Sequence, residues 1–259
     1  MAYWKRTGAQ TFMPTEHVEG SWDLEDQHIA PTLGLLAHEI ERDRDRRRDD
    51  ALVVQRLSYD ILGTLPLEEV HVAVEVLRPG RTIELVQATA THGGRAAVLL
   101  RAWLGQPRDT GDLAGSELPA MPRPDDLEPW QMSELWPGGF IGSVEIRRED
   151  RGPGRARTWV RTAHGLVEGE EVTRLAAAAG LFDIGNGLAV RADPQRVMFP
   201  NLDLTAHLFR TPVAGWLGFD TSVSFGPAGV GLTSTVLHDE QGPIGTMAQS
   251  LTVRPWPAP

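Results

Sequence analysis

An internal repeat of alternating apolar residues restricts the fold of this chain more than any other feature. Residues 201–225 and 229–253 read as three consecutive antiparallel strands. A similar pattern lies 132 positions earlier, in residues 70–104, when Arg78 is superimposed on Arg210. The matched pairs are then Val70 with Leu202, Val72 with Leu204, Val74 with Ala206 and Val76 with Leu208. We therefore expect one αβ unit to be used twice.

Each unit is expected to contain extended segments, one helix and antiparallel strands. Apolar residues at helical spacing predict a helix over 32–47, and acids in a first turn predict another over 168–182. Further strands are expected at about 52–62, 69–78, 81–91, 95–104, 136–150 and 156–167. A Pro-, Gly- and Asp-rich stretch without periodicity indicates a linker. We expect an N-terminal unit at 1–115, the linker at 116–135 and a C-terminal unit at 136–259.

Composition excludes several classes of function. The 259 residues include no Cys, which excludes a disulfide framework, a thiolate nucleophile and thiolate metal ligands. The net charge of −10 argues against nucleic acid as a partner. The run from Glu39 to Asp50 interleaves acids with arginines, as a solvated helix end does. No apolar run reaches the roughly 20 residues of a membrane span, so we expect a cytoplasmic protein without a membrane partner.

The predicted elements fit one arrangement well. One helix laid on a long, curling antiparallel sheet is the hotdog arrangement, and two such units can join their sheets edge to edge. We therefore expect an α+β fold, a tandem (double) hotdog in which each half is a long antiparallel sheet wrapped around a central helix. Two unrelated α+β domains are the alternative.

Two polar residues lie within apolar surroundings. Gln249 is in phase with Met247, Leu251 and Val253, so its amide shares a strand face with large apolar side chains. Asp183 lies near the end of the predicted second helix, where the helix dipole disfavours an acid. Buried polar groups need partners, which makes both residues candidates for a shared site.

Several segments, in this order, carry a resemblance to a known family. They are GSWDLEDQHIAPTLGLLAHEIE (20–41), LAAAAGLFDIGNG (175–187), NLDLTAHLFRTP (201–212), GVGLTSTVLHDEQGPIG (229–245) and AQSLTVRP (248–255). The chain resembles the bacterial type II acyl-CoA thioesterases, the double-hotdog family. The resemblance implies hydrolysis of an acyl-CoA to a free acid and coenzyme A, without cofactor or metal. It also implies a possible homo-oligomer, because sheet edges in this fold commonly pair.

The resemblance also implies a catalytic set. In the family an Asp from the second helix, a Thr from the next strand and a Gln from the last strand orient the hydrolytic water. Asp183 and Gln249 match the Asp and the Gln, whereas Asn201 stands where Thr is typical. An amide can still hold water through its oxygen and nitrogen. Thr205 shares the strand face of Asn201 and is a second candidate for this role.

Substrate contacts are expected near the helices. His28 would line the start of the first helix, and a helix N-terminus near Gly34 or Gly169 would offer N–H groups to the thioester oxygen. The acyl chain would run beside the small side chains of 176–179, which end at Ala179.

Two other functions fit the same sequence. Asn201 in place of Thr suits a module that binds acyl-CoA without hydrolysing it. Asp23 and His28 have the spacing of an enoyl-CoA hydratase pair, although the residues between them are LEDQ rather than the hydratase pattern. The chain has no G-x-S-x-G segment and its histidines lack metal-ligand spacing, so neither a serine hydrolase nor a metal site is expected.

Overall fold

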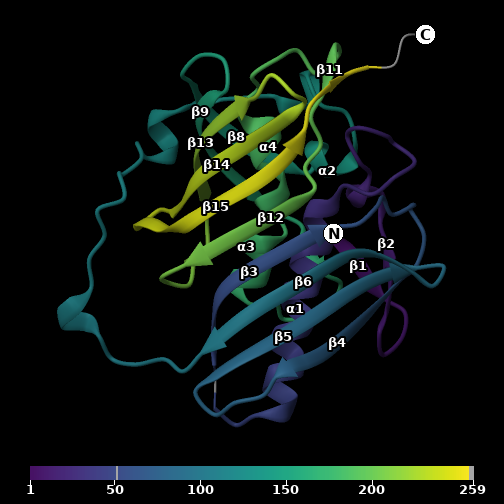
Figure 1. Ribbon diagram of the computed structural model, residues 1–259, viewed down its shortest axis with the longest axis vertical. Coiled ribbons are helices and arrows are strands. Elements are labelled where there is room, and N and C mark those ends of the chain that lie inside the picture. The colour runs from purple at the N-terminus through teal and green to yellow at the C-terminus, as the bar shows by residue number, and fades with distance from the viewer. Residues whose placement is uncertain (51, 257–259) are drawn as a thin grey trace.

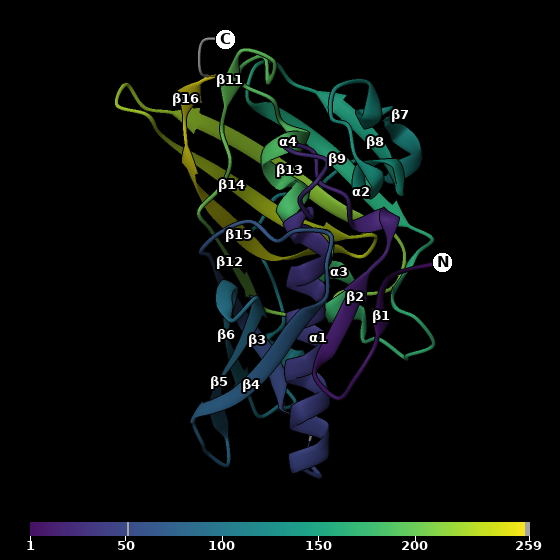
Figure 2. The same cartoon turned by 90° about the vertical axis from the view of Figure 1, so that its right-hand side faces the viewer.

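The computed structural model describes residues 1–50 and 52–256. One sheet of fourteen strands curls around helix α1 (Ile29–Arg47), as Figures 1 and 2 show. Every pair of neighbouring strands in this sheet is antiparallel except one at an edge, so the main prediction of helices on an antiparallel sheet is confirmed. No helix among the described residues is long and apolar enough to cross a membrane.

The N-terminal half contributes four long strands. They are β3 (Val53–Ile61), β4 (Val70–Arg78), β5 (Ile83–His92) and β6 (Arg95–Gly105). Their order in the sheet is β4-β5-β6-β3, so the first strand after the helix folds back beside the last. Their buried residues alternate with exposed ones, because one face of the sheet covers α1 and the other faces solvent.

The C-terminal half repeats this topology. Its strands are β12 (Asp203–Leu208), β13 (Leu217–Phe225), β14 (Val230–Asp239) and β15 (Gly242–Thr252), in the sheet order β12-β15-β14-β13. The expectation of three strands over 201–253 is therefore wrong by one strand. A loop that contains Pro212 and Gly215, whose φ is +122°, separates β12 from β13.

The repeat is real, but its spacing is 147 residues. The separation is the same for the first residues of β4 and β13 (Val70 and Leu217), β5 and β14 (Ile83 and Val230), and β6 and β15 (Arg95 and Gly242). The alignment of Arg78 with Arg210 is therefore wrong, because it pairs β4 with β12, whose topological counterpart is β3.

The sheets of the two halves join edge to edge through β3 and β12. Strands β3 and β12 pair antiparallel, with Ser58 opposite Thr205 and their hydroxyl oxygens 2.9 Å apart. Each half thereby covers the sheet edge that it would expose alone.

Shorter elements extend the sheet at both ends. At one end lie β1 (Ala2–Arg6), β2 (Thr11–Pro14) and β10 (Gly165–Val167), and at the other lie β7 (Glu128–Pro129), β8 (Val144–Asp150) and β9 (Arg155–Thr162). β1 and β10 form the parallel pair, so the N-terminal strand pairs with a strand of the second half of the chain. The predicted strand over 136–150 is shorter than expected, because helix α2 (Gly139–Gly142) precedes β8. Outside this sheet, β11 (Val197–Met198) pairs with β16 (Arg254–Pro255).

The helix of the second half is short and broken. It consists of α3 (Arg174–Ala179), the single 3-10 turn η5 (Phe182–Ile184) and α4 (Gly185–Leu188). The predicted helix start at 168 is wrong, because the Glu168 N–H bonds to the carbonyl of Trp4 and Thr173 caps the helix at the Ala176 N–H. Three further 3-10 turns lie at Glu16–Val18 (η1), Pro124–Asp126 (η3) and Met132–Glu134 (η4), and a fourth at Gly111–Leu113 (η2).

The charged half of α1 is less solvated than expected. Glu39 and Glu41 are buried, and Arg6 of β1 bonds to both Glu39 and Glu170 at 2.5 Å. The N–H groups of Arg42 and a ring nitrogen of His38 also meet Glu170. These bonds connect β1, α1 and the segment before α3. The charged side chains of α1 therefore stabilise the packing of these elements as well as the solvation of the helix.

Candidate active site

Asp183 is the buried carboxylate at the centre of the site. It occupies the turn η5, where the helix of the second half breaks between α3 and α4. Its side chain is 9% exposed among apolar neighbours that include Phe182 and Ile184. The break in the helix thus leaves a carboxylate facing inward instead of along a solvated helix end.

Two amides donate to the same oxygen of this carboxylate. Asn201 Nδ2 lies 2.6 Å from Asp183 Oδ1, and Gln249 Nε2 lies 3.4 Å from it. No described side chain or N–H group donates a hydrogen bond to the other oxygen, Oδ2. The structure therefore brings the three predicted residues together, with one carboxylate oxygen held and the other available.

Gln249 comes from the inner face of β15. It is fully buried, and its Oε1 has no hydrogen-bond partner among the described residues. Gly185 packs against it, since a Cβ at Gly185 would lie 3.1 Å from Gln249 Oε1. An unpartnered buried amide oxygen is costly, so this atom is a place where a polar partner would stabilise the site.

The surroundings shift the acidity of Asp183. Burial raises the pKa of Asp183 from 3.8 to about 7, although the hydrogen bonds from Asn201 and Gln249 act to lower it. A carboxyl with a pKa near neutrality can accept a proton from water and return it within one cycle.

The start of α1 faces this carboxylate. His28 is the N-cap of α1; its Nδ1 accepts from the Ala30 N–H at 3.2 Å and lies 3.9 Å from Asp183 Oδ2. Burial lowers the pKa of His28 to about 3, so the ring is neutral and carries its proton on Nε2. The N–H of Ile29, the first residue of α1, bonds to no described residue.

An open pocket of about 440 Å³ lies over these groups. Asp183, Asn201, His28 and Ile29 line it, together with apolar side chains such as Leu202. Its size suits a small organic ligand with one polar end at the carboxylate.

The structure places the other predicted substrate contacts elsewhere. Gly34 is inside α1 and packs on α3, where a Cβ would lie 2.8 Å from the carbonyl oxygen of Ala176. Ala179 is fully buried in α3, and Thr205 bonds to Ser58 at the junction of the halves. None of the three lines the open pocket. The expectation that Gly34 or Gly169 marks a helix start is wrong, because the helices begin at Ile29 and Arg174.

The two residues of the pair that suggested a hydratase both line the open pocket, but each contacts a different partner. The Asp23 carboxylate accepts from the N–H of Glu25 at 3.0 Å, within its own turn. His28 faces Asp183 instead, on a different segment of the chain. The carboxylate beside His28 is therefore that of Asp183, the one that Asn201 and Gln249 bind.

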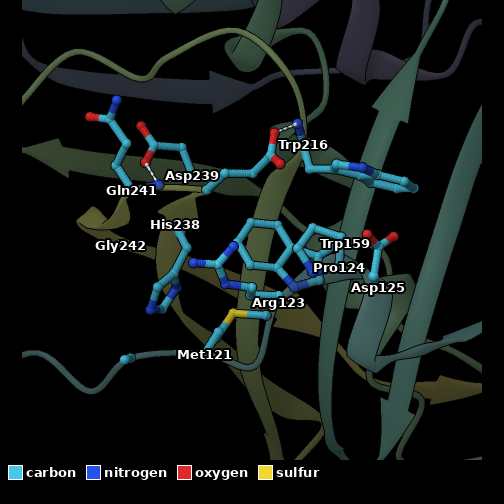
Figure 3. A pocket seen from close by; sticks show the side chains of 12 residues that line it. Met121, Arg123, Pro124, Asp125, Trp159, Trp216, His238, Asp239, Gln241 and Gly242 are labelled. Atoms are coloured by element: carbon cyan, nitrogen blue, oxygen red, sulfur yellow. Dashed lines mark hydrogen bonds between the residues drawn. The ribbon is translucent and has the colours of Figure 1, made fainter.

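A second pocket lies between the linker and the end of β14 (Figure 3). Here Trp159 Nε1 donates to the carbonyl of Pro122, and a ring nitrogen of His238 lies 2.9 Å from the carbonyl of Pro119. The buried acid of this pocket, Asp239, is held by Arg210 through two bonds of 2.5 and 2.6 Å. These contacts dock the linker on the sheet, and they engage the buried carboxylate of this pocket.

One group of side chains has the spacing of metal ligands. His38, Glu39 and Glu170 offer ligand atoms within 4.8 Å of one another. Arg6 and Arg42 form salt bridges with these two carboxylates, so the negative charges are balanced without a metal ion. The cluster therefore fits a structural ion network better than a metal centre.

Comparison with solved structures identifies the fold. A hot dog fold protein from Alicyclobacillus acidocaldarius matches with a TM-score of 0.74 at 12% identity, over 98% of this chain and 96% of that one. An acyl-CoA thioesterase II from Mycobacterium marinum matches at 0.66 and 16% identity, over 99% and 97%. A tesB protein from Mycobacterium avium subspecies paratuberculosis matches at 0.65 and 17% identity, over 97% and 96%. The predicted double hotdog is thus confirmed.

Sequence comparison identifies the family. A search of curated protein sequences finds no match. Two family models do match: the acyl-CoA thioesterase N-terminal domain over residues 18–105, and the acyl-CoA thioesterase C-terminal domain over 122–253. Together these two segments include α1, the long strands of both halves and every residue of the buried carboxylate site. The chain belongs to the acyl-CoA thioesterase family and is a thioester hydrolase.

Proposed function

We propose that this protein hydrolyses an acyl-CoA with a water molecule that Asp183, Asn201 and Gln249 position. The observation that carries the proposal is the unequal use of the two Asp183 oxygens. Both amides donate to Oδ1, so Oδ2 is left to accept a proton from water.

The unpartnered Gln249 Oε1 completes a site for that water. A water molecule that donates one hydrogen to Asp183 Oδ2 and the other to Gln249 Oε1 directs a lone pair outward. Asn201 then acts on the carboxylate, since its amide nitrogen bonds to both Asp183 Oδ1 and the Asp203 carbonyl.

The reaction follows from this arrangement. The water oxygen attacks the thioester carbonyl carbon while its proton moves to Asp183 Oδ2. The carbonyl oxygen becomes negative, and the Ile29 N–H at the start of α1 would donate to it. The C–S bond then breaks, and Asp183 returns its proton to the coenzyme A thiolate. The products are a free acid and coenzyme A.

A thiol-release assay with a panel of acyl-CoA thioesters tests this function. Turnover supports hydrolysis, whereas binding without thiol release would support a binding module. Loss of absorbance from an enoyl-CoA without thiol release would support a hydratase.

The Gln249→Leu variant tests the role of the amide. It should lower kcat by roughly 10-fold or more with little change in KM, because the amide acts on water and not on the acyl group. An unchanged kcat would contradict the proposed water site.

A further inference from the structure

His28 brings a side-chain hydrogen-bond donor to the open pocket beside Asp183. Its Nδ1 accepts from the Ala30 N–H at 3.2 Å, so the single proton of the neutral ring is on Nε2. Nε2 forms no hydrogen bond with a described residue, but unlike Gln249 Oε1 it is not fully enclosed. The ring lines the open pocket, so this N–H is available to an acceptor on a bound ligand.

The contact between His28 and Asp183 contains no shared proton. Nδ1 is 3.9 Å from Asp183 Oδ2, and the lone pair of Nδ1 is already used by the Ala30 N–H. Burial lowers the pKa of His28 to about 3, and the positive end of the α1 dipole also disfavours a charged ring there. His28 therefore neither pairs with Asp183 as a cation nor competes with it as a base near neutral pH.

The orientation of the ring is set by its neighbours. The cap bond to Ala30 holds Nδ1, and the buried ring of Phe140 in α2 packs against the imidazole, with centroids 4.2 Å apart and planes tilted by 36°. The backbone N–H of His28 also bonds to the carbonyl of Val18 at 2.7 Å. The direction of the Nε2–H bond is thus fixed before a ligand binds, which is the condition for electrostatic preorganisation.

The position of this donor suits a carbonyl oxygen at the site. The argument rests on the proposed function, in which water on Asp183 Oδ2 attacks the thioester carbonyl carbon from roughly 3–3.5 Å. Nδ1 is 3.9 Å from that same carboxylate oxygen, and Nε2 is separated from Nδ1 by one ring carbon. Ile29, whose N–H has no described partner, follows His28 in the chain and lines the same pocket. Both donors therefore lie on the side of the pocket that the attacked carbonyl must occupy.

We infer that His28 is a catalytic residue that donates its Nε2–H to the thioester carbonyl oxygen, so that one side-chain donor and one backbone donor at the start of α1 hold the oxyanion. The Nε2 proton stays on the ring throughout the reaction. The hydrogen bond strengthens as negative charge develops on the carbonyl oxygen, and it therefore acts mainly on the transition state. A neutral imidazole at a helix N-terminus is suited to polarise a carbonyl in this way.

Two substitutions separate this role from the capping of α1. Asn has an oxygen that can cap the Ala30 N–H but is too short to replace Nε2, whereas Gln has an amide N–H that reaches further and is not a preferred cap. His28→Asn should lower kcat by roughly 100-fold with little change in KM, and should unfold at the same urea concentration as the wild type. His28→Gln should keep more activity than His28→Asn and unfold at a lower urea concentration.

His71→Asn is the matched control. His71 is exposed on β4, where its ring meets Gln10, so the same change there should leave kcat unchanged. If activity follows stability instead, with His28→Asn as active as the wild type, His28 is only a helix cap and the inference is overturned.

Infrared spectroscopy of a bound thioester separates this inference from the proposed function. The probe is butyryl-CoA labelled at its carbonyl carbon and bound to Asp183→Asn. Because a hydrogen bond lowers the stretching frequency of a carbonyl, the frequency should rise when His28→Asn is added to this variant. If the wild type releases no thiol from any acyl-CoA, the proposed function is wrong, and the frequency still decides whether His28 meets the carbonyl. If the wild type is active but the two complexes have the same frequency, only the role of His28 is wrong.

Discussion

At the scale of single residues, the site depends on a buried acid whose charge is only partly compensated. Asn201 and Gln249 both donate to Asp183, yet no Lys or Arg of the described residues forms a salt bridge with it, and the nearby ring of His28 is neutral. Burial therefore dominates, and the pKa rises toward neutrality. The raised pKa makes Asp183 a useful base near neutral pH. The buried charge of its ionised form also lowers the stability of the folded protein.

The first prediction concerns the pH dependence of activity. Only the ionised form of Asp183 can accept a proton from water, so kcat/KM should rise with pH and reach a plateau above about 7, the pKa of its carboxyl. The measurement is kcat/KM between pH 5 and pH 9 with a substrate that is stable over this range. A profile that is flat from pH 5 to pH 7 would show that another group is the base.

The second prediction concerns stability. The folded protein holds the Asp183 proton more tightly than the unfolded chain does, so its contribution to stability falls as pH rises from about 4 to about 7. Asp183→Asn removes this cost and keeps an acceptor oxygen. Its free energy of unfolding should match that of the wild type near pH 4 and exceed it at pH 8, by roughly 4 kcal/mol at most.

Urea unfolding at the two pH values measures this difference. Asp112→Asn is the matched control, because Asp112 is exposed in the turn η2 and the same change there should leave the free energy of unfolding close to that of the wild type. If Asp183→Asn were less stable than the wild type at pH 8, the burial cost assigned to this carboxylate would be wrong.

The sequence could reveal part of this site. Gln249 and Asp183 are visible as polar residues within apolar patterns, and the family resemblance adds Asn201. The Ile29 N–H could not be found, because a backbone N–H leaves no mark in a sequence. The sequence predicts a helix start at residue 32, whereas α1 begins at Ile29, because Pro31 is tolerated throughout the first helical turn and does not fix the cap.

At the scale of elements, the break in the second helix creates the site. Gly180 ends α3, and the following turn directs Asp183 inward toward β15. Periodicity could not predict the break, since the apolar residues Leu181, Phe182 and Ile184 continue the helical pattern. The alternation also does not fix the register of the repeat, because any two alternating strands align when one is shifted by an even number of residues.

The third prediction concerns the crossing of the two helices. A Cβ at Gly34 would lie 2.8 Å from both the Ala176 carbonyl oxygen and the Gly180 Cα, which are backbone atoms that cannot move independently. Gly34→Ala should therefore lower the free energy of unfolding by roughly 1–3 kcal/mol, despite the better helix propensity of Ala.

Thermal or urea unfolding measures this loss. Gly142→Ala is the control, because a Cβ at Gly142 in α2 would meet no atom within 4 Å. Equal stability of Gly34→Ala and Gly142→Ala would contradict the close approach of α1 and α3.

At the scale of the whole molecule, the site belongs to both halves. His28 and Ile29 come from the first half, whereas Asp183, Asn201 and Gln249 come from the second. The joint sheet fixes their relative position through β3 and β12. The sequence predicted this edge-to-edge joint from the presence of two units, but not that the N-terminal strand β1 would pair with β10 of the other half.

The fourth prediction follows from the shared sheet. Residues 136–259 expressed alone would expose the edge of β12 and lose the α1 residues that face Asp183. We expect this fragment to aggregate and to release no thiol. Size-exclusion chromatography and the thiol assay measure both, and an active monomeric fragment would contradict a site built from two halves.

The most direct test of the account is the rate of thiol release by Asp183→Asn. The variant keeps the shape of the side chain and an acceptor for Asn201 and Gln249, but it cannot take a proton from water. With a substrate that the wild type hydrolyses, its kcat should fall by roughly 100-fold or more. Circular dichroism should show the same fold. Wild-type thiol release that Asp183→Asn leaves unchanged would contradict the assignment of this carboxylate as the catalytic base.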